Sequence, residues 1–273
     1  MKLTCLIDSA ARPHSAFETE PGLAFLIDSA HGSVLFDTGL TGRVLLHNLG
    51  LAGRTPEDIA AVALSHAHRD HSGGLADLLE RRPDLPVYAH PDLLRERFSR
   101  REGAMRSAGL PPETARVLRR SDLRLSEQPQ QVLPGVWTSG AIEDRPEPEG
   151  RSAHHYLRQG EEWVADPYRD DMALIVECAQ GLVLICGCCH AGIMNTLRHV
   201  ERQFGRRPAA VVGGMHLVGA DAAQLRYVIG ALDHMGAPML YPNHCTGEAA
   251  YMELAFAFGE RVGPFPAGAV LEF

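Results

Sequence analysis

The sequence lacks any apolar run approaching the ~20 residues that a membrane-spanning helix requires. The apolar run near its start, within Met1–Asp8, is too short for a signal peptide. A spaced cysteine framework is also missing, because the six cysteines include an adjacent pair, Cys188 and Cys189. Disulfide frameworks belong to oxidising compartments, so this absence favours a reducing one. We therefore expect a cytoplasmic protein that makes no contact with membranes.

Positive charge is scarce as well. The 273 residues carry a net charge of −8, whereas a general nucleic-acid binder needs a basic face. With 45% apolar and 22% charged residues, the composition is that of a soluble globular protein. One segment is locally basic and contains Arg95, Arg97, Arg100, Arg101 and Arg106. An anionic small-molecule substrate or another partner could dock there, although a solvated helix face is the favoured explanation.

The densest chemistry lies between Leu64 and Gly74. His66, His68, Asp70 and His71 fall directly after an apolar run typical of a buried strand. Imidazole and carboxylate are ordinary ligands for zinc and its first-row neighbours. Side chains two residues apart in extended chain point to the same side, so one metal ion can take both His66 and His68. Asp70 and His71 in the next turn would hold a second ion beside it.

Four further polar residues also follow predicted strands. They are Asp37, His190, His216 and His244. Because strand ends on one rim of a sheet meet in space, and open α/β architectures place their sites there, we expect one cleft rather than scattered histidines.

These stretches resemble a known family. His66-x-His68-x-Asp70-His71 is similar to the signature of the metallo-β-lactamase superfamily, and Phe36–Gly39 is similar to its first motif. Three later stretches resemble the branch named after 7,8-dihydropterin-6-methyl-4-(ribofuranosyl)aminobenzene 5'-phosphate synthase: Gly187–Gly192, Gly213–His216 and Asn243–Gly247. Pattern alone indicates one α/β domain with mixed sheets. The resemblance implies an α+β fold, an αββα sandwich spanning residues 1–273, with metals in a cleft at one edge.

The resemblance also suggests roles for the candidate residues. One divalent ion would be held by His66, His68 and His190, and a second by Asp70, His71 and His244. Zinc is the expected metal, with manganese and iron as alternatives, and the ions would activate a shared hydroxide. Asp37 would support the ligands by accepting the N–H of a histidine or by bonding the turn backbone. Asp70 and His216 are the catalytic candidates, although His216 could be a purely structural rim residue.

The sequence departs from the superfamily pattern in two places. No histidine follows Pro134–Gly135, where much of the superfamily carries a metal ligand, and the carboxylate that commonly bridges the metals is replaced near Gly187–Cys188. The branch resemblance suggests that His190 compensates. Cys188 or Cys189 could bind a metal ion as a thiolate, although the favoured role for both is that of a small, buried apolar side chain that fills space in the core. Asp170 or Asp171 could also supply an oxygen, so the number of ions and their bridge stay open.

Two segments near these motifs also carry predictions. Pro91 is expected to open a helix rich in Leu and Arg. Residues 143–160 are expected to form a long, charged loop that acts as a flap, with His154 and His155 binding substrate.

The predicted function is a metal-dependent hydrolase acting on a phosphate-containing or pterin-like small molecule. A lactone or thioester hydrolase and a mononuclear iron enzyme acting on sulfur compounds are the alternatives. A non-catalytic zinc module would need only four closed ligands, and the motifs supply more.

Overall fold

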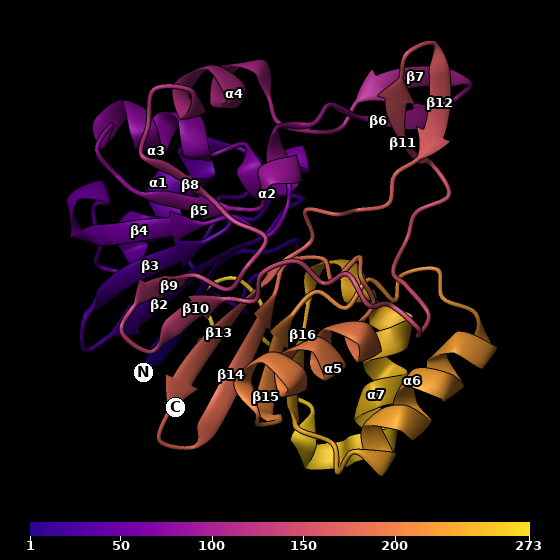
Figure 1. The fold of residues 1–273 in the computed structure, drawn as a ribbon. Helices are drawn as coiled ribbons and strands as arrows, with labels where there is room; N and C mark the ends of the chain where they lie inside the picture. The colour runs from indigo at the N-terminus through magenta and orange to yellow at the C-terminus, as the bar shows by residue number, and fades with distance from the viewer.

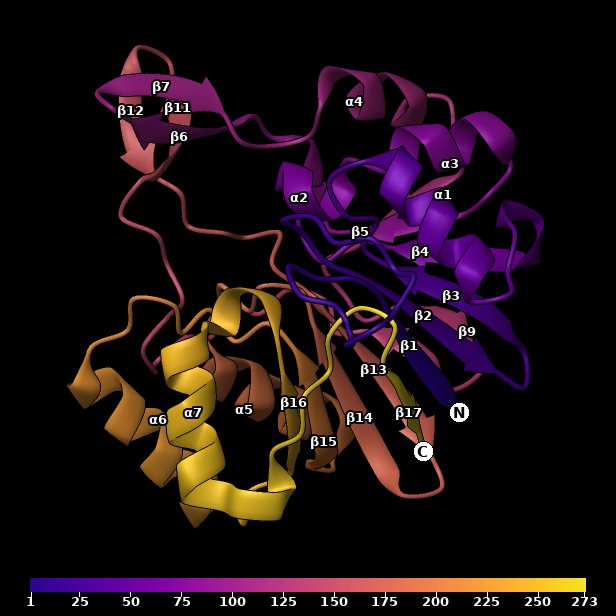
Figure 2. The same ribbon diagram turned by 180° about the vertical axis from the view of Figure 1, so that it is seen from behind.

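A computed structural model describes residues 1–273 and contains two large sheets packed face to face (Figures 1 and 2). The first sheet has the strand order β17-β1-β2-β3-β4-β5-β8. Its strands are β1 (Lys2–Ile7), β2 (Ala24–Ser29), β3 (Gly32–Phe36), β4 (Ile59–Ala63), β5 (Val87–Ala89), β8 (Leu123–Leu125) and β17 (Val270–Glu272). The helices on its outer face are α1 (Gly42–Leu51), α2 (Arg69–Ser72), α3 (Leu75–Arg81) and α4 (Pro112–Leu118).

The second sheet has the order β16-β15-β14-β13-β10-β9. Its strands are β9 (Gln131–Leu133), β10 (Val136–Thr138), β13 (Ala173–Cys178), β14 (Gly181–Cys186), β15 (Pro208–Gly213) and β16 (Met239–Pro242). Helices α5 (Ile193–Phe204), α6 (Ala222–His234) and α7 (Glu248–Phe258) cover its outer face. Short 3₁₀ turns complete the chain: η1 (Pro56–Asp58), η2 (Pro91–Leu94), η3 (His244–Thr246) and η4 (Gly259–Arg261).

Three buried clusters hold these layers together. One lies between the sheets and includes Phe25, Phe36 and Ile185. The other two join each sheet to its own helices, through residues such as Leu45 on one side and Leu197 on the other. Strands buried on both faces are continuously apolar, as in β14 (Gly-Leu-Val-Leu-Ile-Cys). The predicted αββα sandwich is therefore confirmed. No helix is long and apolar enough to cross a membrane.

A third, small sheet stands apart from the sandwich (Figures 1 and 2). It has the order β12-β11-β6-β7, with β6 (Arg97–Arg101), β7 (Ala104–Ser107), β11 (His155–Gln159) and β12 (Glu162–Ala165). The helix expected after Pro91 is wrong, because only the short η2 forms before β6 begins. The loop expected at 143–160 is wrong at its end, where β11 pairs with β6. Both errors have one cause: the pairing joins segments far apart in the chain, so local spacing does not reveal it.

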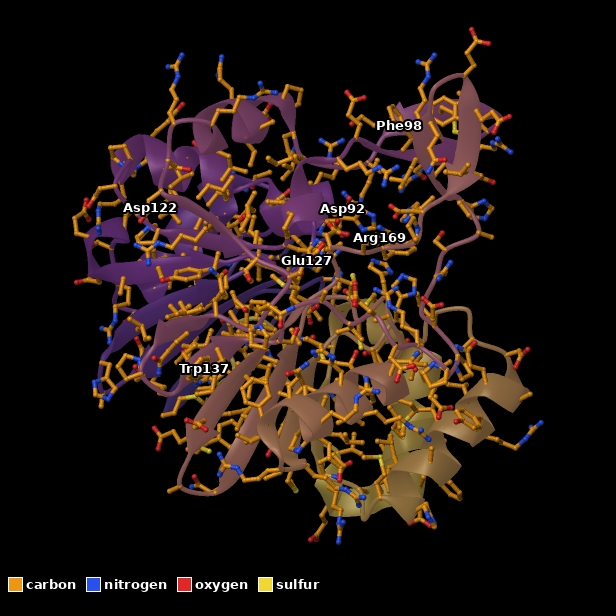
Figure 3. All side chains as sticks on the ribbon, viewed as in Figure 1. Asp92, Phe98, Asp122, Glu127, Trp137 and Arg169 are labelled. Atoms are coloured by element: carbon orange, nitrogen blue, oxygen red, sulfur yellow. The ribbon has the colours of Figure 1, made fainter.

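A buried arginine anchors the small sheet. Arg97, at the start of β6, is 1% exposed and forms ion pairs with Asp92 (3.2 Å), Asp166 (3.1 Å) and Asp170 (2.5 Å). Figure 3 shows Asp92 where the chain leaves the sandwich and Phe98 within the small sheet. The second oxygen of Asp170 accepts the Ala67 N–H at 2.8 Å, between His66 and His68. One ionic network therefore connects the small sheet to the histidine turn.

We expect Arg97→Ala to lower the free energy of unfolding by about 3–5 kcal/mol, because it leaves buried carboxylates without their cation. Urea denaturation measures this. The control is Arg100→Ala on the same strand: Arg100 is exposed and lies 4.6 Å from the Tyr156 ring, a contact of about 1 kcal/mol or less. Equal losses in the two variants would contradict a structural role for the Arg97 network.

Candidate metal centre

The ends of β3 and β4 meet at Asp37. Its carboxylate is fully buried and accepts three hydrogen bonds, each 2.7 Å long, from the Ser65 N–H, the Ser65 hydroxyl and Nδ1 of His71. The sequence predicted either a histidine or the turn backbone as its partner, and the structure shows both. The backbone of Asp37 has a φ of +60°, which turns the chain sharply after the strand.

These hydrogen bonds define which ring nitrogens are free. Because Nδ1–H of His71 donates to Asp37, its Nε2 carries a lone pair. The Ser65 hydroxyl gives its proton to Asp37 and therefore accepts from Nδ1 of His66 at 2.8 Å, which leaves Nε2 of His66 free as well. Nδ1 of His190 donates to the Gly150 carbonyl at 2.8 Å, which leaves Nε2 of His190 free as well. Three imidazoles therefore present bare Nε2 atoms, as metal ligands do.

Two groups of candidate ligand atoms contain only histidine and aspartate side chains. In the first, the ligand atoms of His66, His68 and His190 lie within 4.8 Å of one another. In the second, those of Asp70, His71 and His244 do the same. The groups come from the turn after β4, from α2, from the turn after β14 and from η3, so separate strand ends of both sheets meet at one rim. These are the two ligand sets that the sequence predicted.

The residues present fit divalent cations. Nε2 of His68, Nε2 of His190 and Nδ1 of His244 are buried without a hydrogen-bond partner. Nε2 of His66 lies 3.0 Å from Nδ1 of His68, and Nε2 of His71 lies 3.1 Å from Nε2 of His244. Buried polar atoms left unpaired cost free energy, and a cation bound beside these nitrogens would offset that cost.

Burial keeps most of these histidines neutral. It lowers the pKa of His66, His68 and His190 well below the usual value, with neighbouring histidines contributing. Burial and the nearby His71 lower the pKa of His244 to about 3. His71 differs, because the Asp37 and Asp70 carboxylates outweigh burial and raise its pKa. Neutral imidazole is the form that binds a metal ion.

The structure separates the two neighbouring cysteines. Sγ of Cys189 faces the Thr196 hydroxyl at 3.2 Å and belongs to the apolar cluster under α5, which suits the expected role of buried filler. Sγ of Cys188 instead lies 3.2 Å from Nε2 of His71, inside the ligand cluster. The two thiols therefore have different surroundings, which their adjacency in the sequence conceals.

Asp170 and Asp171 support the ligand turns and belong to neither ligand group. Asp170 bonds the Ala67 N–H and Arg97, and Asp171 accepts the Ala191 N–H at 2.8 Å, next to His190. Gly187 also has a role that differs from a simple turn: a Cβ there would lie 2.1 Å from the Ser65 hydroxyl, so only glycine lets β14 approach Asp37 and Ser65.

The segment predicted as a flap lies against the metal-site turn. Gly150 accepts from His190, and its own N–H donates to the His190 carbonyl at 3.0 Å. The segment therefore holds a ligand imidazole in place. His155 lines the cavity and reaches the Tyr168 hydroxyl at 2.8 Å, whereas His154 is exposed and does not line the cavity. Sequence reasoning missed Tyr168, a fully buried residue whose ring stacks on His190 at 4.0 Å.

The ligand groups open into a cavity of about 620 Å³. His216, which follows β15, lines it with its ring 4.4 Å from that of His190. Three arginines also line it: Arg69 from α2, Arg101 from β6 and Arg106 from β7. We expected the basic segment of the sequence to be a solvated helix face, and this expectation is wrong. The segment contains the β6–β7 hairpin, from which two arginines line the same cavity as the histidines.

Comparison with known proteins gives consistent results. The family model described as "Metallo-beta-lactamase superfamily" matches residues 18–187. The chain is 30% identical to 7,8-dihydropterin-6-methyl-4-(beta-D-ribofuranosyl)-aminobenzene-5'-phosphate synthase of Methanocaldococcus jannaschii, over 100% of this chain and 97% of that protein. Among solved structures it is similar to Tm1679, described as a metal-dependent hydrolase of the beta-lactamase superfamily, with a TM-score of 0.86 and 28% identity over 100% of this chain and 99% of the other. YhfI of Bacillus subtilis shares the fold, with a TM-score of 0.58, 14% identity and 99% of each chain covered.

We expect His190→Ala to lower the metal bound per chain sharply and to preserve the circular dichroism spectrum, because it removes one of three nitrogen donors from a rim rather than from the core. Elemental analysis of dialysed protein measures the metal. His154→Ala is the control, since that ring lies outside the cavity. Unchanged metal content in His190→Ala would remove His190 from the ligand set.

Proposed function

The chain belongs to the metallo-beta-lactamase superfamily, and from this premise we propose that it is a metal-dependent hydrolase acting on an anionic small molecule that carries a phosphate group or a pterin-like ring. The observation that carries the proposal is the coincidence, in one cavity, of two groups of metal-ligating side chains with three arginines.

Two divalent ions are proposed as cofactors, with zinc expected and manganese or iron as alternatives. His66, His68 and His190 would hold one, and Asp70, His71 and His244 the other. Such ions would supply an activated water, since the pKa of water falls from ~16 toward ~7 when a metal binds it. The donor set favours this reading over a mononuclear iron enzyme, because it offers ligands to more than one ion.

Asp70 and His216 are proposed to handle protons. Oδ2 of Asp70 lies 3.9 Å from Nε2 of both His71 and His244, and a third of its side chain is exposed to the cavity, so it can accept a proton from the attacking water. Burial lowers the pKa of His216, which favours the neutral ring, and a neutral imidazole carries one N–H. That N–H can donate a hydrogen bond to the leaving-group oxygen.

The arginines are proposed to select the substrate. Guanidinium groups bind phosphate through paired hydrogen bonds, and they stay charged at any physiological pH. Arg101 and Arg106 reach the cavity from the small sheet and Arg69 from α2, so an anionic group would be held opposite the histidine-rich wall. The name of the Methanocaldococcus jannaschii relative includes a phosphate group, which supports this substrate class.

The name of that relative ends in "synthase", which suggests a second function, group transfer by a synthase. In a synthase reaction, the cavity would bind an acceptor other than water, and the transferred group would be joined to that acceptor. Lactone and thioester hydrolysis are further alternatives, although an uncharged substrate of either kind would leave the three arginines of the cavity without an anionic partner. Metal analysis of protein purified without added salts, combined with phosphate ester, lactone and thioester substrates in the presence and absence of an acceptor, separates these functions.

We expect His68→Ala to reduce hydrolysis of a phosphate ester by orders of magnitude, because activation of water depends on the metal that His68 would hold. Its circular dichroism should match that of the parent protein. Steady-state kinetics measures the effect. Retention of more than about a tenth of the activity would be incompatible with this role, since loss of activated water costs far more than that.

We expect Arg101→Ala and Arg106→Ala each to lower kcat/KM for a phosphorylated substrate about tenfold or more, mainly through KM, because a hydrogen bond to a charged group contributes about 1.5–3 kcal/mol. Bound metal should not change. Arg100→Ala changes an exposed side chain next to Arg101 that does not line the cavity, and it should leave kcat/KM unaltered. If the uncharged substrates were affected as strongly as the phosphorylated one, anion recognition by these arginines would be ruled out.

A further inference from the structure

One face of the small sheet carries a row of polar side chains across three strands. His155 of β11 pairs with Ser99 of β6, and Ser99 pairs with Arg106 of β7. Residues paired directly across neighbouring strands point to the same side of a sheet, and so do residues two apart on one strand, which adds Arg101 to this face. All four residues line the cavity beside the metal-ligand groups. This face of the small sheet is therefore one wall of the cavity.

The other face of the small sheet has a different character. The rings of Phe98 and Trp163 pack edge to face at 4.9 Å, and the guanidinium group of Arg100 lies over the Tyr156 ring at 4.6 Å. None of these four residues lines the cavity. The alternation of side chains therefore separates aromatic contacts on the outer face from hydrogen-bond donors on the cavity face.

The donors on the cavity face are available to a ligand. Ser99 is 6% exposed, and its hydroxyl forms no hydrogen bond within the protein. Arg101 pairs with no carboxylate, and Arg106 has only the exposed Glu102 at 3.7 Å. Arg97, on the same face of β6, differs from them because three aspartates already neutralise it. One hydroxyl and two guanidinium groups are thus free to bind an anion from outside the chain.

His155 separates this wall from the metal-ligand histidines. Its ring lies 4.7 Å from that of His68 on one side, and its backbone pairs with Ser99 on the other. The Tyr168 hydroxyl, 2.8 Å from Nδ1 of His155, holds the ring in this position. Neighbouring strands lie about 4.8 Å apart, so Arg106 is about two strand spacings from His155. An anion held by the Ser99 hydroxyl would accordingly lie beyond His155, away from the ligand nitrogens.

The free donors suit a phosphate monoester. Its three terminal oxygens accept paired hydrogen bonds from guanidinium groups and a further one from a hydroxyl. The cavity volume of about 620 Å³ lies in the range of cavities that hold drug-sized ligands, so it exceeds what a phosphate group alone needs. One molecule can therefore place a phosphate on the small sheet and a second functional group at the ligand histidines.

We infer that Ser99, Arg101 and Arg106 bind a terminal phosphate of the substrate on the small sheet, apart from the bond that reacts beside the metals. The inference rests on the proposed function and specifies its substrate class: the substrate carries a phosphate monoester in addition to the ester bond that is broken, and this phosphate stays on the product. Ser99 thereby gains a role in binding, and His155 marks the boundary between the two ends of the substrate.

Binding of glycerol 3-phosphate to the zinc-loaded protein tests the inference without relying on activity. We expect isothermal calorimetry to detect binding of this compound and none of glycerol. Ser99→Ala and Arg106→Ala should each raise the Kd about tenfold or more, because each removes a hydrogen bond to a charged group. Arg100→Ala is the matched control and should leave the Kd unaltered, since that side chain lies on the outer face. Circular dichroism shows whether each variant is folded.

Removal of the metal distinguishes the small sheet from the metal ions as the place of binding. After treatment with a chelator and dialysis, the parent protein should bind glycerol 3-phosphate with a similar Kd. Ser99→Ala should weaken this binding as much as it does in the zinc-loaded protein. If chelation unfolds the chain, the comparison of Ser99→Ala with the parent in the zinc-loaded state decides alone, because a phosphate bound only to the metals would not depend on the Ser99 hydroxyl.

Each outcome bears on the inference. A Kd that depends on Ser99 and Arg106 but not on metal supports it. It is overturned if the parent does not bind glycerol 3-phosphate, if binding disappears with the metal from a folded chain, or if Ser99→Ala binds as tightly as the parent. Equal losses in Arg100→Ala and Arg106→Ala overturn it as well, since they indicate a general attraction to positive charge. The proposed function fails separately, if a protein that binds glycerol 3-phosphate on the small sheet takes up no metal.

Discussion

The buried carboxylate of Asp37 is the interaction on which both ligand groups depend. Removing a carboxylate from water costs several kcal/mol, and here three hydrogen bonds from Ser65 and His71 offset that cost. One oxygen orients His71 directly and His66 through the Ser65 hydroxyl, so a single side chain sets the tautomer of a ligand in each group. The close approach of β14 at Gly187 depends on the same place. Core packing, hydrogen bonding and the orientation of the candidate metal ligands therefore depend on one strand end.

The parts of the site that the sequence predicted share one property: each is specified locally. His66, His68 and His190 follow continuous apolar strands, and a buried strand ends where its polar residues begin. Because neighbouring strands end at one rim, their convergence could be expected without knowing any pairing. The two predicted ligand sets are brought together in the structure for this reason, although their binding of metal remains a prediction. The alternation of strands and helices indicated one α/β domain with mixed sheets, and the αββα layering followed from the family resemblance.

The parts that the sequence did not reveal depend on contacts between distant segments. β6 pairs with β11, and Arg97 forms ion pairs with carboxylates far away in the chain, whereas the local pattern after Pro91 suggested a helix. Tyr168 has no motif around it, yet it stacks on His190. Cys188 and Cys189 are identical side chains in adjacent positions, and only the positive φ of Cys189 distinguishes them. His154 and His155 likewise differ because β11 begins between them and alternate residues face opposite sides.

The small sheet is assembled from two hairpins that belong to different halves of the molecule. β6 and β7 lie between β5 and β8 of the first large sheet, whereas β11 and β12 lie between β10 and β13 of the second, and the two hairpins join only through the β6–β11 pairing. An isolated two-stranded hairpin is marginal in water and leaves an edge open to pairing. If the chain were cut in the connection between β8 and β9, neither fragment could form this sheet or complete either ligand group. The two fragments would have to reassociate, and their reassociation would rebuild the arginine-lined wall of the cavity and the two histidine-rich groups in a single event.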